Sequence, residues 1–322
     1  MLETIASVDT RHEDMIHDAQ LDFFGKRLAT ASSDRTIRIF DVVGDKHTFV
    51  TELKGHEGPV WQVAWAHPKY GNILASCSYD RKVIIWRESA GQWVKAYEYA
   101  GHTSSVNSIC WAPPEYASLL GDDVGLVLAC ASSDGFVSIL TNNESGWEPE
   151  KFHAHDIGCN AVSWAPAFNA FAGSDSNGAA AAAAPAKRRL VTGGCDSNVK
   201  IWQLRDGKWI LEGNLPQAHT DWVRDVCWAP NIGLPVNVVA SCGQDKRVVI
   251  CTESREGEWK SKELPVFPDV VWRVSWSVTG DILAVSGGDG KASLWKEDLD
   301  GNWACISEMD DAASNASAAD AH

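Results

Sequence analysis

The sequence is short of basic residues and has no long apolar run. Its 322 residues include 28 Lys and Arg against 43 Asp and Glu, giving a net charge of −15. A nucleic-acid-binding protein needs a basic stripe, and the only basic run is Lys187-Arg188-Arg189. The longest alanine stretch, residues 179–184, is far below the ~18 residues of a membrane span. We therefore expect neither nucleic-acid binding nor direct membrane insertion.

Patterns that carry chemistry are also scarce. The nine cysteines are an odd number with no C-x-x-C pair, and most stand in apolar runs, where a thiol acts as a small buried hydrophobic group. No unique nucleophile, paired carboxylates or phosphate-binding loop appears, and no basic region followed by an apolar core marks a secretory signal. We predict no catalytic residue, no metal, no cofactor and a reducing compartment.

What the sequence has in abundance is tryptophan, and a repeat. Sixteen Trp and 26 Gly accompany only 3 Met, a poor composition for a helical bundle. Six times an Asp stands six residues before the anchor of an apolar run, with 44 to 62 residues between successive copies. The pairs are Asp34 and Phe40, Asp80 and Trp86, Asp134 and Leu140, Asp196 and Trp202, Asp245 and Cys251, and Asp289 and Trp295.

Each copy predicts four short strands. The first strand ends near a Trp, the Asp makes the tight turn between the second and third strands, and a Gly-containing turn leads to the fourth. This pattern resembles the WD-repeat family, although the Trp-Asp pair itself is absent and Phe40-Asp41 is its nearest match. The resemblance implies an all-β, six-bladed β-propeller, which we place as one domain over residues 1–306.

The WD-repeat resemblance also implies a buried network in each blade. The network joins a loop His, a second-strand Ser or Thr, the turn Asp and the third-strand Trp, and a desolvated Asp needs such donors. A catalytic His/Asp/Ser site is disfavoured because the trio repeats on several blades. Blades three and six, with Cys130 and Val285 in place of the hydroxyl, are expected to depend more on packing. The predicted members are His56, Ser76, Asp80 and Trp86, and His155, Thr192, Asp196 and Trp202.

All six repeats have a fourth strand of their own, so residues 2–8 are left over. We interpret this segment as the first strand of an unfinished seventh blade, with the propeller open until a partner adds strands beside it. The alternative is a six-bladed ring that closes, with a frayed N-terminus. The predicted partner-binding residues are Leu2, Thr4, Ile5, Ala6 and Val8.

Longer stretches carry a more specific resemblance. GHEGPVWQVAWAHPKYG (residues 55–71), ILASCSYDRKVIIW (73–86) and DWVRDVCWAP (221–230) are similar to the Sec-thirteen family, the small WD-repeat subunits of the COPII outer coat and the nuclear-pore Y-complex. The resemblance implies a non-enzymatic scaffold in the cytoplasm, peripheral on COPII vesicles and ER exit sites, and at nuclear pores in the nuclear envelope. The implied partners are a Sec-thirty-one-like coat subunit, a Nup-ninety-six-type nucleoporin and a nutrient-signalling complex of the SEA/GATOR type.

The sequence leaves two alternative interpretations of function open. One is the nucleoporin paralogue of the Seh-one type, which shares the AHPKYG-like turn. The other is a peptide-binding adaptor such as a ubiquitin-ligase substrate receptor, but the Trp-Asp-x-Arg of those receptors is missing after every third strand. Two segments fall outside the repeat: a predicted disordered loop insert in blade four (167–188) and a predicted disordered acidic tail (307–322).

Overall fold

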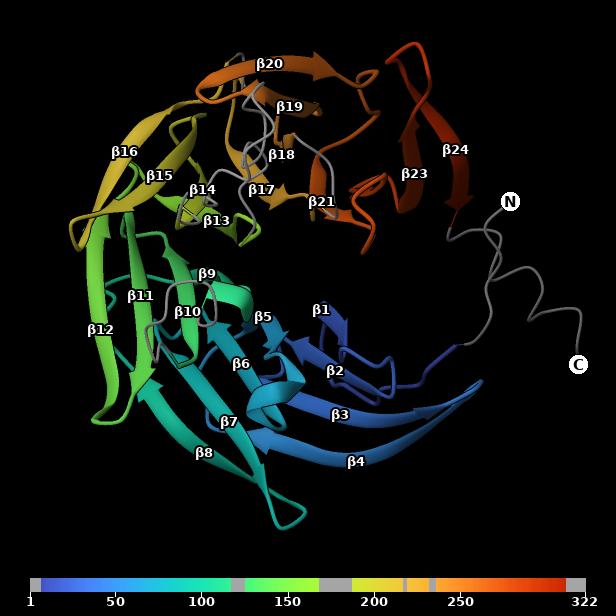
Figure 1. Cartoon of the computed structure of the whole chain (residues 1–322). Coiled ribbons are helices and arrows are strands. Elements are labelled where there is room, and N and C mark those ends of the chain that lie inside the picture. Colours follow the sequence, from blue (N-terminus) through green and yellow to red (C-terminus); the bar gives the residue numbers. More distant parts are fainter. Residues whose placement is uncertain (1–6, 117–124, 168–186, 217–218, 232–235, 311–322) are drawn as a thin grey trace, which may run out of the picture. The chain divides into compact units, whose positions relative to one another are not determined.

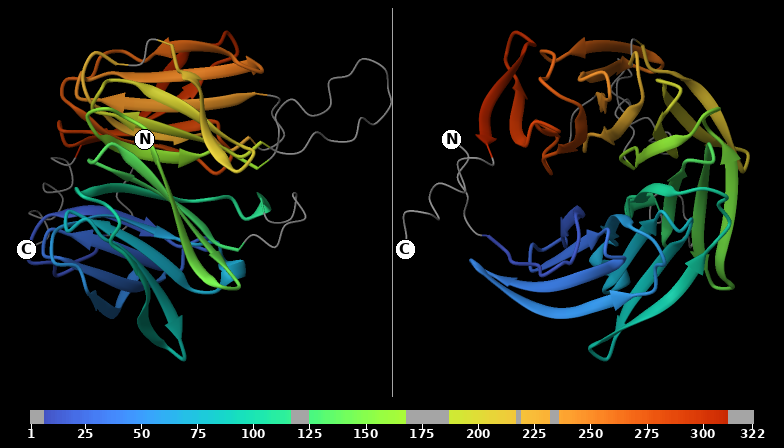
Figure 2. Two further views of the ribbon diagram at one scale, coloured as in Figure 1. Left: turned by 90° about the vertical axis from the view of Figure 1, so that its left-hand side faces the viewer. Right: turned by 180° about the vertical axis from the view of Figure 1, so that it is seen from behind.

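A computed structural model describes residues 7–116, 125–167, 187–216, 219–231 and 236–310. The chain divides into two compact units, Ile5–Val162 and Met1–Thr4 with Ser163–His322, and each is described by itself. The units consist of four-stranded antiparallel sheets, which we number as blades 1 to 6 in chain order. Neighbouring blades of one unit face each other (Figure 1; Figure 2).

Blades 1 to 3 make up the unit Ile5–Val162, and in each the strands lie side by side in chain order. One short 3-10 helix, η1 (Pro68–Tyr70), lies in blade 2. The strands of blade 1 are β1 (Ile16–Leu21), β2 (Arg27–Ser32), β3 (Thr36–Val43) and β4 (Lys46–Lys54); those of blade 2 are β5 (Val60–Trp65), β6 (Ile73–Ser78), β7 (Val83–Ser89) and β8 (Gln92–Tyr99); those of blade 3 are β9 (Val106–Trp111), β10 (Val127–Ser132), β11 (Phe136–Asn143) and β12 (Gly146–His153).

Blades 4 to 6 repeat the same plan. The boundary between the two units falls inside β13, the first strand of blade 4. The strands of blade 4 are β13 (Cys159–Trp164), β14 (Arg189–Gly194), β15 (Val199–Arg205) and β16 (Lys208–Asn214); those of blade 5 are β17 (Val223–Trp228), β18 (Asn237–Gly243), β19 (Val248–Arg255) and β20 (Glu258–Glu263); those of blade 6 are β21 (Val271–Trp276), β22 (Ile282–Gly287), β23 (Lys291–Glu297) and β24 (Trp303–Asp310).

The inner strands of blade 2 are apolar on both faces because this blade is packed between blades 1 and 3. In β7, Ile84 and Trp86 belong to the core shared with blade 1, whereas Val83 and Ile85 belong to the core shared with blade 3. This explains why the repeat reads as a nearly continuous apolar run rather than as a strict alternation. The tryptophans fill the same positions in successive cores.

Every turn between a second and a third strand is built by its Asp. In blade 2, Asp80 Oδ1 accepts the backbone N–H of Lys82 at 2.9 Å, and the intervening Arg81 has a φ of 72°. The same Asx turn recurs in all six blades, since side chains of this type mimic a backbone turn. The left-handed residue after the Asp is Arg35, Arg81, Gly135, Ser197, Lys246 or Gly290.

First-strand tryptophans connect neighbouring blades. Trp65 donates its indole N–H to the carbonyl of Gln20 at 3.0 Å, and Trp111 donates to Ala64 at 2.9 Å. Trp276 makes the equivalent bond to the Cys227 carbonyl in the other unit. In these three cases the acceptor lies on the first strand of the preceding blade, so the Trp serves as a backward connector; the indole N–H of Trp228 in blade 5 has no hydrogen-bond partner among the described residues.

A forward connector lies at the third position of the first strand. Asp18 accepts the backbone N–H of Val63 at 3.0 Å, and Gln62 likewise accepts that of Ile109 at 2.8 Å. Asp225 does the same for Val274 at 3.1 Å. Blade 4 has Ala161 at this position, and there Ser163, two residues further along the strand, accepts the Trp228 backbone N–H of blade 5 at 3.0 Å.

The structure confirms the prediction of an all-β chain with six four-stranded blades. Strand β24 continues to Asp310, because its pairing with β23 extends to Lys291 opposite Asp310. Residues 307–310, assigned from the sequence to the tail, thus belong to a strand. Most of the predicted insert and the rest of the tail lie outside the described residues.

Candidate functional site

The network predicted for blade 2 lies at the Asp turn. His56 Nδ1 is 2.9 Å from Asp80 Oδ2, and His56 Nε2 is 2.8 Å from Ser76 Oγ. Trp86 donates its indole N–H to the same Ser76 oxygen at 2.9 Å. Because a carboxylate only accepts, the imidazole proton is on Nδ1, and the donors run from Trp86 through Ser76 and His56 to Asp80.

Burial and hydrogen bonding act in opposite directions on the Asp80 carboxyl. The side chains of His56 and Asp80 are only 1% and 5% exposed. Burial by itself raises the pKa of Asp80, but hydrogen bonds from His56 and from the backbone N–H groups of Glu57 and Lys82 outweigh it and lower the pKa to about 2. The ionised carboxylate is therefore a fixed part of the folded blade.

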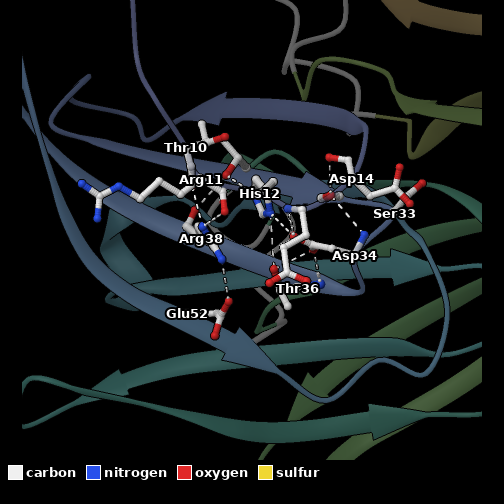
Figure 3. Close-up of polar contacts among 12 residues, drawn as sticks. Thr10, Arg11, His12, Asp14, Ser33, Asp34, Thr36, Arg38 and Glu52 are labelled. Carbon is white, nitrogen blue, oxygen red and sulfur yellow. Dashed lines mark hydrogen bonds and ion pairs between the residues drawn. The ribbon is translucent and has the colours of Figure 1, made fainter.

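Blade 1 carries a similar network, without an indole donor because Phe40 replaces the Trp, and the sequence analysis did not predict it (Figure 3). His12 Nδ1 lies 2.7 Å from Asp34 Oδ2, and His12 Nε2 lies 2.8 Å from Thr30 Oγ1. In blades 2 to 5 a Gly or Ala precedes the loop His, whereas Arg11 precedes His12. The spacing of 22 residues between His12 and Asp34, against 24 between His56 and Asp80, would have found it.

Blades 4 and 5 place their networks at the same turn. In blade 4, Trp202 donates to Thr192 Oγ1 at 3.0 Å. The predicted member His155 is fully buried, and it belongs to the other unit. Asp196 accepts the backbone N–H of Asn198 at 3.2 Å. In blade 5 the members are His219, Asp245 and Ser241, with distances of 3.0 Å from His219 to each partner.

In blades 3 and 6 the hydroxyl has moved to the neighbouring strand. His102 Nε2 lies 2.8 Å from Ser138 Oγ, and Ser138 is paired directly with Cys130, the residue that replaces the usual hydroxyl. In blade 6, Trp295 donates to Ser293 Oγ, and Ser293 is paired with Val285. Blades 3 and 6 were expected to depend more on packing; in blade 3, however, the cross-strand exchange keeps a polar network of His102, Asp134 and Ser138.

The network of blade 3 shows how these groups hold the turn. Both carboxylate oxygens of Asp134 are engaged, by His102, Lys151 and backbone N–H groups, and the imidazole of His102 is buried. Burial lowers the pKa of His102, which keeps its ring neutral despite the neighbouring carboxylate. Within the described ranges, no group of three His, Cys, Asp or Glu side chains is placed to hold a metal ion. The same residues contain no helix of sufficient length and apolar character to span a membrane.

The side of blade 1 that faces away from blade 2 forms a second feature. Arg38 donates from Nη1 to the carbonyl of Thr10 at 2.8 Å and to that of Arg11, and from Nη2 to Glu52 at 3.0 Å (Figure 3). A cavity of about 320 Å³ adjoins it. The cavity is lined by Asp9, Thr10, Arg11, Arg38, Phe40, His47, Phe49 and Glu52.

The predicted partner-binding strand leads into this surface. Leu2, Thr4, Ile5 and Ala6 lie outside the described residues. Val8 is partly buried in a segment to which no strand is assigned, directly before the cavity residue Asp9. Arg38 therefore fixes the chain that follows residues 2–8 on the surface of blade 1, a role that the sequence pattern did not reveal.

Six four-stranded sheets with a repeated Asp turn define a WD-repeat β-propeller. In agreement, the family model for the WD domain, G-beta repeat, matches residues 4–41, 47–87, 93–139, 212–251 and 262–296. The chain is 57% identical to Protein SEC13 homolog of Homo sapiens, over 99% of this chain and 97% of that protein. It is 58% identical to the Bos taurus homolog (96% and 94% covered) and 48% identical to Protein transport protein SEC13 of Mycosarcoma maydis (94% of each). The chain belongs to the SEC13 family.

The cross-strand exchange in blade 3 can be tested by comparing a double variant with the single variants. Ser138→Val leaves the buried His102 Nε2 without its hydroxyl and should lower the free energy of unfolding by about 1–3 kcal/mol. Adding Cys130→Ser returns the hydroxyl to the strand where blade 2 has it, and should recover at least half of that loss in urea unfolding. A double variant no more stable than Ser138→Val, or a gain of stability from Cys130→Ser alone, would contradict the exchange.

The turn carboxylates predict a loss of stability in acid. The folded-state pKa values of Asp34, Asp80, Asp134 and Asp245 all lie below the ordinary value, so their contribution is complete above about pH 5 and disappears as the pH falls from about 4 to 2. Urea unfolding across this range should give a shallower fall for Asp80→Asn, by up to about 1.4 kcal/mol per pH unit.

The matched control for acid unfolding is Asp45→Asn, which alters an exposed carboxyl in the turn between β3 and β4. Its stability should follow the wild-type pH dependence. An unchanged slope for Asp80→Asn would show that the network carboxylate is not the group being protonated.

Proposed function

We propose that this chain is a non-enzymatic scaffold subunit of the COPII vesicle outer coat in ER-to-Golgi transport, and also of the nuclear-pore Y-complex. In both settings it would bind a large helical-solenoid partner that donates strands for a seventh blade. The names of its relatives support a role in protein transport. The finer proposal rests on the first and last blades, whose connecting residues and face burial differ from those of the neighbouring blades.

The connecting residues of the first and last blades differ from those of blades 2 and 5. The backward connector Trp65 of blade 2 is replaced in blade 1 by Leu21, an exposed side chain with no N–H to donate. The forward connector Asp225 of blade 5 is replaced in blade 6 by Arg273, whose side chain has no acceptor atom. Blade 1 is thus built without the Trp that would bond to a preceding blade, whereas blade 6 shares its lack of an acceptor at this position with blade 4, which has Ala161.

The face of blade 1 that points away from blade 2 is also incompletely covered. Leu74 and Leu128, which occupy this position in blades 2 and 3, are fully buried, whereas their blade 1 equivalent Leu28 is partly exposed. Phe49 is 55% exposed at the cavity, and Arg38 Nε is buried with no hydrogen-bond partner among the described residues. An incoming strand would supply apolar side chains to cover Leu28 and Phe49, and a backbone carbonyl to accept the N–H of Arg38 Nε.

Blade 6 shows the complementary asymmetry within its own unit. Leu283 and Trp295, which face blade 5, are buried, but Ala284, Ala292 and Leu294 on the opposite face of the sheet are only partly buried. In blade 5 the residues equivalent to Ala284 and Ala292 are fully buried. Apolar sheet faces of this kind are normally covered, so we expect donated strands to bury them.

The cellular location follows from the same proposal. The chain would be cytoplasmic, peripheral on COPII vesicles and ER exit sites through a Sec-thirty-one-like subunit, and at nuclear pores through a Nup-ninety-six-type nucleoporin. A SEA/GATOR-type complex is a third setting for the same donated blade. With a net charge of −15, the chain is repelled by anionic lipid, so its contact with the membrane is expected to be indirect.

A binding experiment with the blade-donating segment of the Sec-thirty-one-like partner tests this function. Isothermal titration should give a one-to-one complex with the full chain, with at least about tenfold weaker affinity after deletion of residues 2–8, because the donated strands lose their hydrogen-bonded neighbour. Phe49→Asp should weaken binding similarly by placing a charge in the contact.

Phe23→Asp is the matched control, because it changes another exposed aromatic residue of blade 1 away from the cavity lining. It should leave the affinity unchanged. Full affinity after deletion of residues 2–8 and in Phe49→Asp would overturn the proposal that a partner completes a blade at this face.

A further inference from the structure

An arginine between two exposed tryptophans forms a second surface feature, on blades 5 and 6. The Arg224 guanidinium carbon lies 5.1 Å from the ring centroid of Trp222 and 4.7 Å from that of Trp272. The two indoles are 45% and 46% exposed, whereas the other fourteen tryptophans of the chain are buried or partly buried. Stacking between two rings fixes the plane of the guanidinium.

The hydrogen bonding of Arg224 is one-sided. Nε and Nη2 both donate to the Gln244 side-chain oxygen, with 2.9 Å for the Nε bond. Among the described residues, Nη1 has no hydrogen-bond partner and no carboxylate lies within ion-pair distance of the guanidinium. One edge of the fork is therefore anchored by a neutral amide, while the other remains available for an acceptor.

The backbone keeps this cluster, which we call the Trp–Arg cluster (Trp222, Arg224 and Trp272), in place. The Trp222 carbonyl accepts the Gln244 backbone N–H at 2.8 Å. Gln244, which anchors the guanidinium, is therefore itself hydrogen-bonded to the residue that carries the first indole. Gly288 lies against the other indole, and a side chain there would meet Asp269 at 2.9 Å and approach Trp272 Nε1 at 3.4 Å. The cluster is thus held ready rather than formed by a flexible surface arginine.

The nearby acidic side chains are engaged with the backbone. Asp221 Oδ1 accepts the Trp222 N–H at 2.7 Å, and Asp269 Oδ1 accepts the Val270 N–H at 2.8 Å. Burial lowers the pKa of Arg224, as expected for a cation that is desolvated without a bonded counter-ion. An arginine still remains ionised at neutral pH, so the cluster presents an uncompensated positive charge.

We propose that the Trp–Arg cluster binds a side-chain carboxylate of a short extended peptide segment from a partner protein. The carboxylate would accept two hydrogen bonds from the free edge of Arg224, a geometry that matches the planar guanidinium fork. An apolar residue beside it in the peptide would pack on the exposed indole faces, and Trp and Arg are the residues that most often dominate peptide and protein contacts. A polyanionic nucleic acid is disfavoured by the net charge of −15.

This inference is independent of the donated blade, because it rests on residues of blades 5 and 6 that the blade 1 experiment does not alter. Its probe is a display library of random eight-residue peptides, selected on the intact chain. Enriched peptides should share an Asp or Glu next to an apolar residue. For one such peptide, fluorescence anisotropy should show at least a tenfold loss of affinity on changing its Asp or Glu to the amide.

The protein variants localise the contact. Arg224→Met keeps the apolar stem and removes the charge, and it should also lower affinity at least tenfold with little change in thermal unfolding. Arg255→Met is the matched control: Arg255 is exposed at the opposite end of the same blade, and its loss should have no effect. In spectra of ¹⁵N-tryptophan-labelled protein, the peptide should shift the indole signals assigned by Trp222→Phe and Trp272→Phe.

Three outcomes would overturn the proposal. The library could yield no acidic consensus, the selected peptide could bind Arg224→Met as well as the wild type, or the shifted indole signals could belong to other tryptophans. If Arg224→Met unfolds at a lower temperature, Trp222→Ala provides the second variant, since it removes one exposed indole and leaves the Gln244 anchor. Unchanged peptide affinity in Trp222→Ala would also overturn the proposal.

Discussion

The buried aspartate at the turn between the second and third strands is the constraint on which each blade depends. Burial of a carboxylate is unfavourable unless every oxygen accepts hydrogen bonds, and here backbone N–H groups and a loop histidine provide them. Asp80 shows the consequence: its pKa is held at about 2 even though burial acts in the opposite direction. The histidine arrives from the segment before the first strand, so this one anion joins three separate parts of the chain.

The requirement is for a hydroxyl at one point in space, not at one position in the sequence. In blade 2 it comes from Ser76, whereas in blade 3 it comes from Ser138 on the adjoining strand. The two positions form a directly paired couple across the sheet, so either can place its oxygen near the imidazole. A repeat can therefore lose its consensus residue and keep its network, provided that the paired residue changes with it.

The sequence was sufficient to predict the six blades, because the Asp spacing and the fourth strands are local features. It was insufficient for Ser138 and His12, since the first depends on strand register and the second departs from the expected Gly-His or Ala-His. The role of Arg38 was invisible because its partners are backbone carbonyls. The role of Trp222 and Trp272 could not be predicted from the repeat, because it depends on the position of Arg224 between their rings.

The missing Trp at Leu21 and the incompletely covered faces of blades 1 and 6 support the central claim, that the chain is built to receive strands from another protein beside residues 2–8. Hydrogen exchange of those backbone amides, measured for the free chain and for its complex with the blade-donating segment, tests this claim most directly. We predict that exchange of residues 2–8 slows at least about tenfold in the complex, because a strand paired on both sides has its amides bonded. Equally fast exchange in the free chain and in a saturated complex would contradict it.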